Sequence, residues 1–137
     1  QAFYCALSNL DQMAWLATFS GGFPLLPGVA VEIPAPSNAG RLRGPDITRT
    51  IDPDKFASLV PHLDARLNEE LRLLHLTMGL EDGLITTHRD LKRLLDARGI
   101  AYSLMELPGY AHEWRFWRLS PPDLATRLFQ PGQRIAR

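Results

Sequence analysis

The middle of the sequence decides the fold, at residues 71–83, LRLLHLTMGLEDG. Residues 71–78 form a short run with five apolar residues out of eight, which Gly79 ends. A run of this length is typical of a strand that is buried on both faces, as strands of parallel sheets are. A tight turn follows at once and holds a carboxylate, Asp82, between two glycines.

Two further strands are predicted, one on each side of this run. Residues 13–19, MAWLATF, are apolar and are followed by Ser20 and two glycines. Residues 100–107 alternate loosely and end at Pro108 and Gly109. Short apolar or alternating runs bounded by turn residues predict strands.

Helices are predicted between these strands. Asp52 suits the N-cap of a helix that has Pro53 at its first position, and Pro61 divides the segment up to residue 70 into two short helices. Thr87 with an aspartate three residues later resembles a capping box, and Gly99 suits the position after a helix end. The remaining helices are expected at residues 1–8 and 113–129. This alternation predicts the α/β class, with about three parallel strands and flanking helices.

The segment from residue 23 to residue 51 is predicted to be a long loop. It is rich in proline and glycine and shows neither the helical nor the strand periodicity of apolar residues. Long loops inside compact domains are often functional, so a lid or a substrate wall is one interpretation and a plain surface excursion is the other. Phe23 is the residue of this loop that we expect to touch a ligand.

Composition narrows the range of partners. Fifteen basic and fifteen acidic residues cancel, and 45% of the 137 residues are hydrophobic, enough for one domain with a core. We therefore expect a neutral small-molecule ligand, with no nucleic acid and no membrane as partner. The single cysteine, Cys5, is interpreted as a small core residue, and the histidines lack the spacing of a zinc site, so neither a metal nor a cofactor is expected. The sequence is compatible with both a secreted and a cytoplasmic protein.

Two turns carry the candidate site. Ligands of open parallel sheets meet the loops at the carboxyl ends of the strands. Asp82 follows the middle strand in this way, and His112 follows the last one. Both side chains are expected at the same edge of the sheet, where a carboxylate and an imidazole can share a hydrogen bond. An acid followed by a histidine at successive strand ends is the order of the α/β-hydrolase triad after its serine.

The residues around these turns resemble a known family. GLEDGLI at residues 79–85 and GYAHEW at residues 109–114, with Trp117 one turn later, look like the end of the putative esterase family. That family of α/β-hydrolases includes feruloyl and acetyl xylan esterases and relatives of enterochelin esterase and the mycolyltransferases. Residues 1–3 and 7–15 are similar to the segment that follows the family's nucleophile elbow.

The resemblance implies a fold and a function. Residues 1–137 would be the C-terminal portion of one α/β-hydrolase domain. The activity would be hydrolysis of a carboxylic ester, of the carbohydrate or feruloyl type, with His112 as base and Asp82 as acid. The sequence departs from the family in having no G-x-S-x-G motif, because Ser8 and Ser20 both lack the flanking glycines. We therefore expect the serine a few residues before Gln1, in an N-terminal half that acts as partner, and an inactive chain without it.

Several alternatives remain open at this point. Glu81 is the second candidate for the acid, and Glu113 is interpreted as a carboxylate at a helix start. Tyr110 and Trp114 are candidates for substrate contact, although packing of Trp114 with Trp117 on the sheet is the favoured interpretation. The other histidines are interpreted as structural or solvated: His62, His75 and His88. A non-catalytic α/β binding or scaffold domain and an acyltransferase of the same fold are the rival functions.

Overall fold

The computed structural model describes residues 2–21, 30–34, 47–60 and 63–133. Six helices and five strands lie in these ranges. In chain order they are α1 (Ala2–Leu7), β1 (Trp15–Phe19), β2 (Ala30–Pro34), β3 (Ile47–Ile51), α2 (Pro53–Leu59), α3 (Leu67–Glu70), β4 (Leu73–Gly79), α4 (Ile85–Ala97), β5 (Ser103–Leu107), α5 (Trp114–Trp117) and α6 (Ser120–Ala125).

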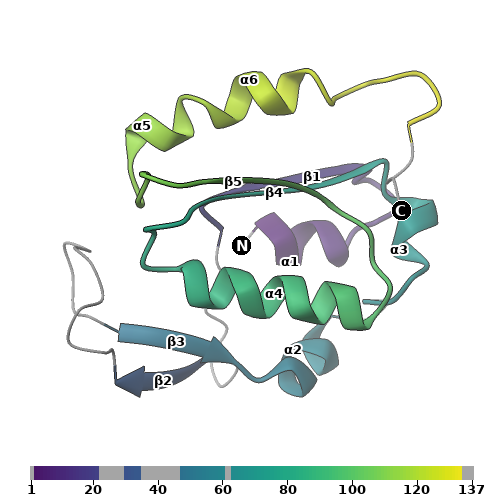
Figure 1. The fold of residues 1–137 in the computed structure, drawn as a ribbon. Coiled ribbons are helices and arrows are strands. Elements are labelled where there is room, and N and C mark those ends of the chain that lie inside the picture. The colour runs from purple at the N-terminus through teal and green to yellow at the C-terminus, as the bar shows by residue number, and fades with distance from the viewer. Residues whose placement is uncertain (1, 22–29, 35–46, 61–62, 134–137) are drawn as a thin grey trace.

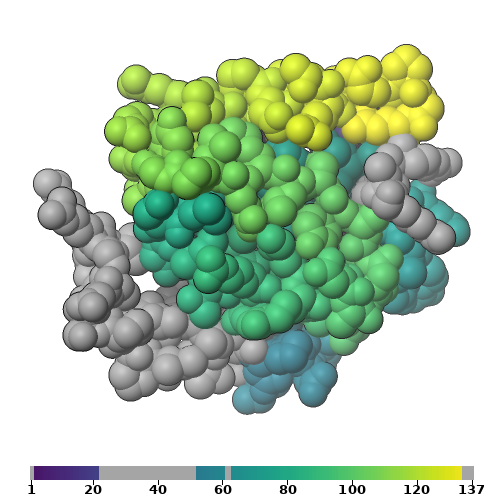
Figure 2. All heavy atoms as spheres, in the orientation of Figure 1, coloured from purple at the N-terminus to yellow at the C-terminus, as the bar shows by residue number. Residues whose placement is uncertain are grey.

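The main sheet has three parallel strands in the order β1-β4-β5. Trp15 pairs with Leu73 at the start of the sheet, and Gly79 pairs with Leu107 at its other end. α1 and α4 cover one face of the sheet, and α5 and α6 cover the other (Figure 1). In the space-filling view, α5, α6 and the residues after them form a continuous layer along one side of the molecule (Figure 2). The α/β class predicted from the sequence is confirmed, with three parallel strands and flanking helices.

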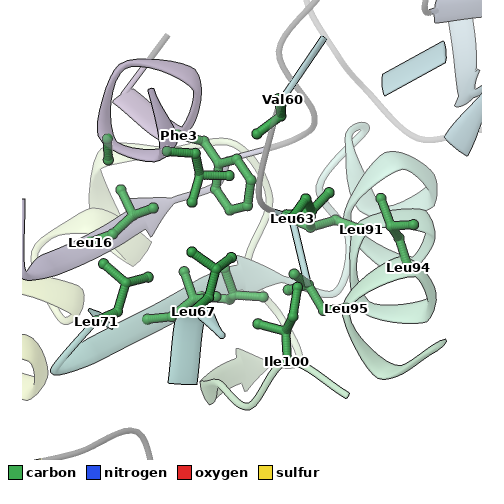
Figure 3. Packing of buried hydrophobic residues seen from close by; sticks show 14 of the residues in the cluster. Phe3, Leu16, Val60, Leu63, Leu67, Leu71, Leu91, Leu94, Leu95 and Ile100 are labelled. Atoms are coloured by element: carbon green, nitrogen blue, oxygen red, sulfur yellow. The ribbon is translucent and has the colours of Figure 1, made fainter. Parts of the chain in front are cut away.

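The two faces of β4 differ in chemistry, although every residue of this strand is buried. Leu74 and Leu76 join the hydrophobic core, while His75 faces the other layer and contacts α6. The core lies between the sheet, α1 and α4, where side chains from these elements point toward one another (Figure 3). The central strand is thus fixed by apolar packing on one side and by polar contacts on the other.

Several predicted element ends are confirmed. The carboxylate of Asp52 accepts hydrogen bonds from the backbone N–H groups of Asp54 and Lys55, both at 3.1 Å, and Pro53 is the first residue of α2. Two short helices, α2 and α3, lie on either side of Pro61. Gly99 follows α4 with a φ of +65°, the left-handed conformation that favours glycine at a helix end.

The predicted long loop at residues 23–51 is wrong in part. It contains β2 and β3, which pair antiparallel as a separate two-stranded sheet. β3 lies beside α4 (Figure 1). Both strands are short runs that include β-branched residues, and the prolines around them concealed that signal. Phe23 lies outside the described residues.

Other predictions near the helices also need correction. The predicted helix at 113–129 is two short helices, α5 and α6, because Pro121 and Pro122 begin a new helix rather than continue one. α4 begins before Thr87, whose hydroxyl donates to the carbonyl of Leu84 instead of capping the helix. Cys5 is exposed and not part of the core, because it lies on the outer face of the short helix α1.

Candidate active site

The two turns predicted to carry the site lie side by side at the carboxyl edge of the sheet. The backbone N–H of Leu80 donates to the carbonyl of Leu107 at 3.0 Å, and that of Glu81 donates to the carbonyl of Tyr110 at 3.0 Å. The side chain of Glu81 adds a third hydrogen bond between the two turns, because its Oε2 accepts from the N–H of Tyr110 at 2.9 Å. The pairing of β4 with β5 therefore continues past the ends of both strands.

Gly79 allows this close approach. A Cβ atom at this position would lie 2.3 Å from the carbonyl oxygen of Tyr110 and 2.7 Å from its carbonyl carbon. Both distances are far shorter than a van der Waals contact, so no side chain fits between the two backbones. Glycine is thus required here by the neighbouring turn rather than by its own φ.

Asp82 and His112 meet at this edge. Nδ1 of His112 lies 3.0 Å from Oδ2 of Asp82. The carboxylate of Asp82 is fully buried, while the side chain of His112 keeps 35% of its surface exposed. Since an ionised carboxylate only accepts hydrogen bonds, the proton of the imidazole is assigned to Nδ1, which leaves Nε2 as a proton acceptor.

Asp82 is held in place from two directions. Its Oδ1 accepts from the backbone N–H of Leu84 at 2.9 Å, and its own N–H donates to the carbonyl of Gly79 at 3.1 Å. The carboxylate also precedes the first turn of α4, where the helix dipole favours a negative charge. A buried carboxylate with these partners can orient an imidazole and stabilise it when it gains a proton.

The alternative carboxylates lie in other contacts. Glu81 binds the backbone of Tyr110, as described above, and has no contact with the imidazole among the described residues. Oε1 of Glu113 accepts from the N–H of Ala111 at 3.4 Å. Of the two candidates for the acid, Asp82 is the one that contacts His112, whereas Glu113 lies at the start of α5, as predicted.

The residues predicted to contact substrate differ in position. Tyr110 is half-buried, with its ring packed on Phe116 at 5.8 Å and the guanidinium of Arg115 over it at 4.9 Å. Trp114 is 73% exposed. The expected contact of Trp114 with Trp117 is present, with ring centroids 5.2 Å apart. The packing of Trp114 on the sheet is wrong, because α5 is a single turn that buries Phe116 and turns Trp114 outward.

Two further residues lie at the site, Ser20 and Trp117. From the sequence, Trp117 was placed in the family-like motif and Ser20 was rejected as an elbow serine, but neither residue was assigned a contact with the site. The ring of Trp117 contacts that of His112, with centroids 4.9 Å apart and planes at 89°. Its Nε1 donates to Oγ of Ser20 at 3.0 Å. Ser20 has a φ of +48°, and this left-handed conformation has no signal in the sequence beyond the two glycines that follow.

A set of Ser, His and Asp side chains lies away from this edge, under α6. Nδ1 of His75 is 2.8 Å from Oγ of Ser103, and its Nε2 is 3.1 Å from Oδ2 of Asp123, at an angle that leaves Nε2 without a hydrogen bond. Burial lowers the pKa of His75, and Arg127 holds the pKa of Asp123 below its usual value. The side chain of His75 has no exposed surface, so this set is structural.

The remaining histidines are consistent with the structural interpretation where they are described. Nε2 of His88 lies 3.1 Å from Oε1 of Glu106, which also accepts from Lys92 at 2.8 Å. Burial lowers the pKa of His88. The side chains of Lys92 and Glu106 are each 23% exposed, so this is a partly buried polar contact. His62 lies outside the described residues.

No known protein-family model matches the chain. Among the described residues, no three side chains of the metal-binding types lie close enough to hold an ion. None of the described helices has the length and apolar character needed to cross a bilayer.

Proposed function

We propose that Asp82 and His112 are the acid and the base of a carboxylic ester hydrolase, whose serine nucleophile lies outside these 137 residues. The observation that carries the proposal is the 3.0 Å contact between a buried carboxylate and a half-exposed imidazole. Its location, at the carboxyl ends of two neighbouring parallel strands, is where ligands of open α/β sheets bind. The carbohydrate or feruloyl nature of the ester rests on the family resemblance alone.

Each of the two residues has a defined part in acyl transfer. Nε2 of His112 takes the proton of the serine hydroxyl as that oxygen attacks the ester carbonyl, and then gives it to the leaving alcohol. Asp82 accepts the Nδ1 proton throughout, which fixes the tautomer and stabilises the imidazolium. The acyl-enzyme is then cleaved by water, with His112 as the base again.

Exposure separates this pair from the other histidine–carboxylate pairs of the fold. His75 and His88 each have a ring nitrogen 3.1 Å from a carboxylate oxygen, but their side chains have no exposed surface. A base that must exchange protons with a substrate needs access on one side and a fixed partner on the other. Among the described histidines, only His112 combines the two.

The test is hydrolysis of p-nitrophenyl acetate by the full natural protein and by two Asp→Asn variants. Asp82→Asn should lower kcat by about 10⁴-fold, because the amide stabilises the wrong tautomer. Asp123→Asn is the matched control, since it removes the same charge from a histidine at 3.1 Å in the structural set. We expect it to lower the melting temperature and to leave kcat within about twofold.

A fluorophosphonate probe, which labels activated serines, provides the second measurement. It should label the full protein, fail to label His112→Ala, and fail to label residues 1–137 alone. Equal activity of the Asp82→Asn and Asp123→Asn variants would contradict the proposal. It would favour a non-catalytic α/β domain in which Asp82 and His112 only fasten two turns.

A further inference from the structure

Trp117 connects the candidate base to a strand that is far away in the sequence. Its ring lies perpendicular to the imidazole of His112, at 4.9 Å, and its Nε1 donates to the hydroxyl of Ser20 at 3.0 Å. Ser20 directly follows β1, whereas the tryptophan belongs to α5. The contact thus joins the carboxyl end of β1 to the short helix that follows β5 and its turn.

The hydroxyl of Ser20 is itself firmly placed. The residue is 2% exposed, and its backbone N–H donates to the carbonyl of Thr77 in β4 at 3.0 Å. Its φ of +48° is uncommon for a residue with a Cβ, and such strained residues concentrate at functional sites. The next residue has no room for a side chain, because a Cβ on Gly21 would lie 2.6 Å from Cβ of Thr18. The turn after β1 therefore restrains the backbone of Ser20, and the indole of Trp117 binds its hydroxyl.

The imidazole needs a second restraint in addition to Asp82. A single hydrogen bond at Nδ1 fixes one atom of the ring but leaves the ring free to tilt about that bond. Nε2, on the far side of the ring, moves most when the ring tilts. The perpendicular ring of Trp117, whose centroid lies 4.9 Å from that of the imidazole, opposes this motion, and an edge-to-face contact of two rings at this distance is favourable in itself.

We propose that Trp117 is a positioning residue, whose ring holds the imidazole of His112 at its working angle and is itself held by the hydroxyl of Ser20. The proposal rests on the function proposed above. Ser20 acts here as a hydrogen-bond acceptor for the indole and not as the nucleophile. Asp82 sets the position of Nδ1, and Trp117 sets the direction of Nε2.

The experiment measures kcat and KM for p-nitrophenyl acetate with the full natural protein. Trp117→Phe keeps a ring but removes the donor, Ser20→Ala removes the acceptor, and Trp117→Ala removes the ring. We expect the first two to lower kcat by about tenfold each and Trp117→Ala by about 100-fold, the loss typical of a misplaced catalytic group, all with KM within twofold. The Trp117→Phe, Ser20→Ala double variant should be no slower than either single variant, because both changes break the same hydrogen bond.

Trp15→Phe is the matched control, because Nε1 of Trp15 donates to Oε1 of Gln133 at 3.3 Å at the opposite end of β1. It removes an indole hydrogen bond as well, and it should leave kcat unchanged. Fully additive losses in the double variant, or wild-type kcat in both single variants, would overturn the positioning role. If those results came with an inactive Asp82→Asn variant, the hydrolase function would still stand. A Ser20→Ala variant as inactive as His112→Ala, with the fluorophosphonate attached to Ser20, would also overturn the proposal and make this serine the nucleophile.

Discussion

Substitution of Gly79 by alanine tests the coupling between the two turns most directly. The added Cβ would lie 2.3 Å from the carbonyl oxygen of Tyr110, so this backbone must retreat by at least 0.7 Å to reach 3.0 Å. Tyr110 is bound to Glu81 through both its N–H and its carbonyl, and His112 is two residues further on. We expect the retreat to break the hydrogen bond between Nδ1 of His112 and Asp82, which is 3.0 Å long.

The magnitudes follow from the size of this shift. Forcing a methyl group into a well-packed site costs about 1–3 kcal/mol of the free energy of unfolding. A misplacement of about 1 Å at a catalytic group costs about 100-fold in rate. Urea unfolding measures the first quantity, and kcat for p-nitrophenyl acetate with the full protein measures the second. The downfield proton resonance of the Nδ1–H of His112 reports on the hydrogen bond independently of any activity.

Gly99→Ala is the control for Gly79→Ala. It introduces the same methyl group at a φ of +65°, with its nearest neighbour 3.9 Å away, and costs about 1–2 kcal/mol through backbone strain alone. Gly99 precedes β5, at the end of the sheet opposite to the candidate site. Loss of stability without loss of kcat is therefore expected. An unshifted Nδ1–H resonance and full activity in the Gly79→Ala variant would refute the reasoning.

Three further predictions concern the stability of the fold. Burial lowers the pKa of His75 and of His88 below 6.5, so the unfolded chain binds protons before the folded chain does as the pH falls. The free energy of unfolding should therefore be fully present above about pH 6.5 and decline below it. In urea titrations, a His88→Gln variant should show a smaller decline between pH 7.5 and pH 5.5 than the unchanged protein. Phe56→Ala should lower the free energy of unfolding by about 3–5 kcal/mol, because the side chain is fully buried and its ring packs on that of Phe3 with centroids 6.2 Å apart. A loss below about 1 kcal/mol in the same titrations would mean that α2 does not anchor the core. Asp52→Ala should cost about 1 kcal/mol through the loss of two hydrogen bonds at the start of α2, whereas Asp52→Asn should retain most of that stability.

The sequence predicted the parts of the fold that depend on local chemistry. The apolar run that forms β4, the N-cap at Asp52 and the left-handed Gly99 each follow from a short stretch of residues. Their order in the chain was enough to place Asp82 and His112 at one edge, since parallel strands share the direction of their carboxyl ends. Contact between two turns 30 residues apart was predictable for this reason.

The remaining features depend on which elements happen to pack together. The hydrogen bond of Trp117 to Ser20 spans 97 positions of the chain, and no pattern near either residue predicts it. Similarly, the exposure of Trp114 depends on α5 being only one turn long, which the spacing of the tryptophans alone did not reveal. The antiparallel pair of β2 and β3 was missed because the strands are short and the prolines near them argued against a strand.

The position of β1 in the sheet has a consequence for assembly. Within the described residues, β1 pairs with β4 alone, so the main-chain groups along its other side form the rim of the sheet. A further strand that pairs with this open edge in the parallel direction would have its carboxyl end beside Ser20, at the same end of the sheet as the imidazole. The direction and register of the added strand then determine which of its residues lie at the site. The added strand need not be joined covalently to this chain. Under the hydrolase function proposed above, a separately expressed segment is therefore expected to supply the serine hydroxyl as well as a covalently joined one.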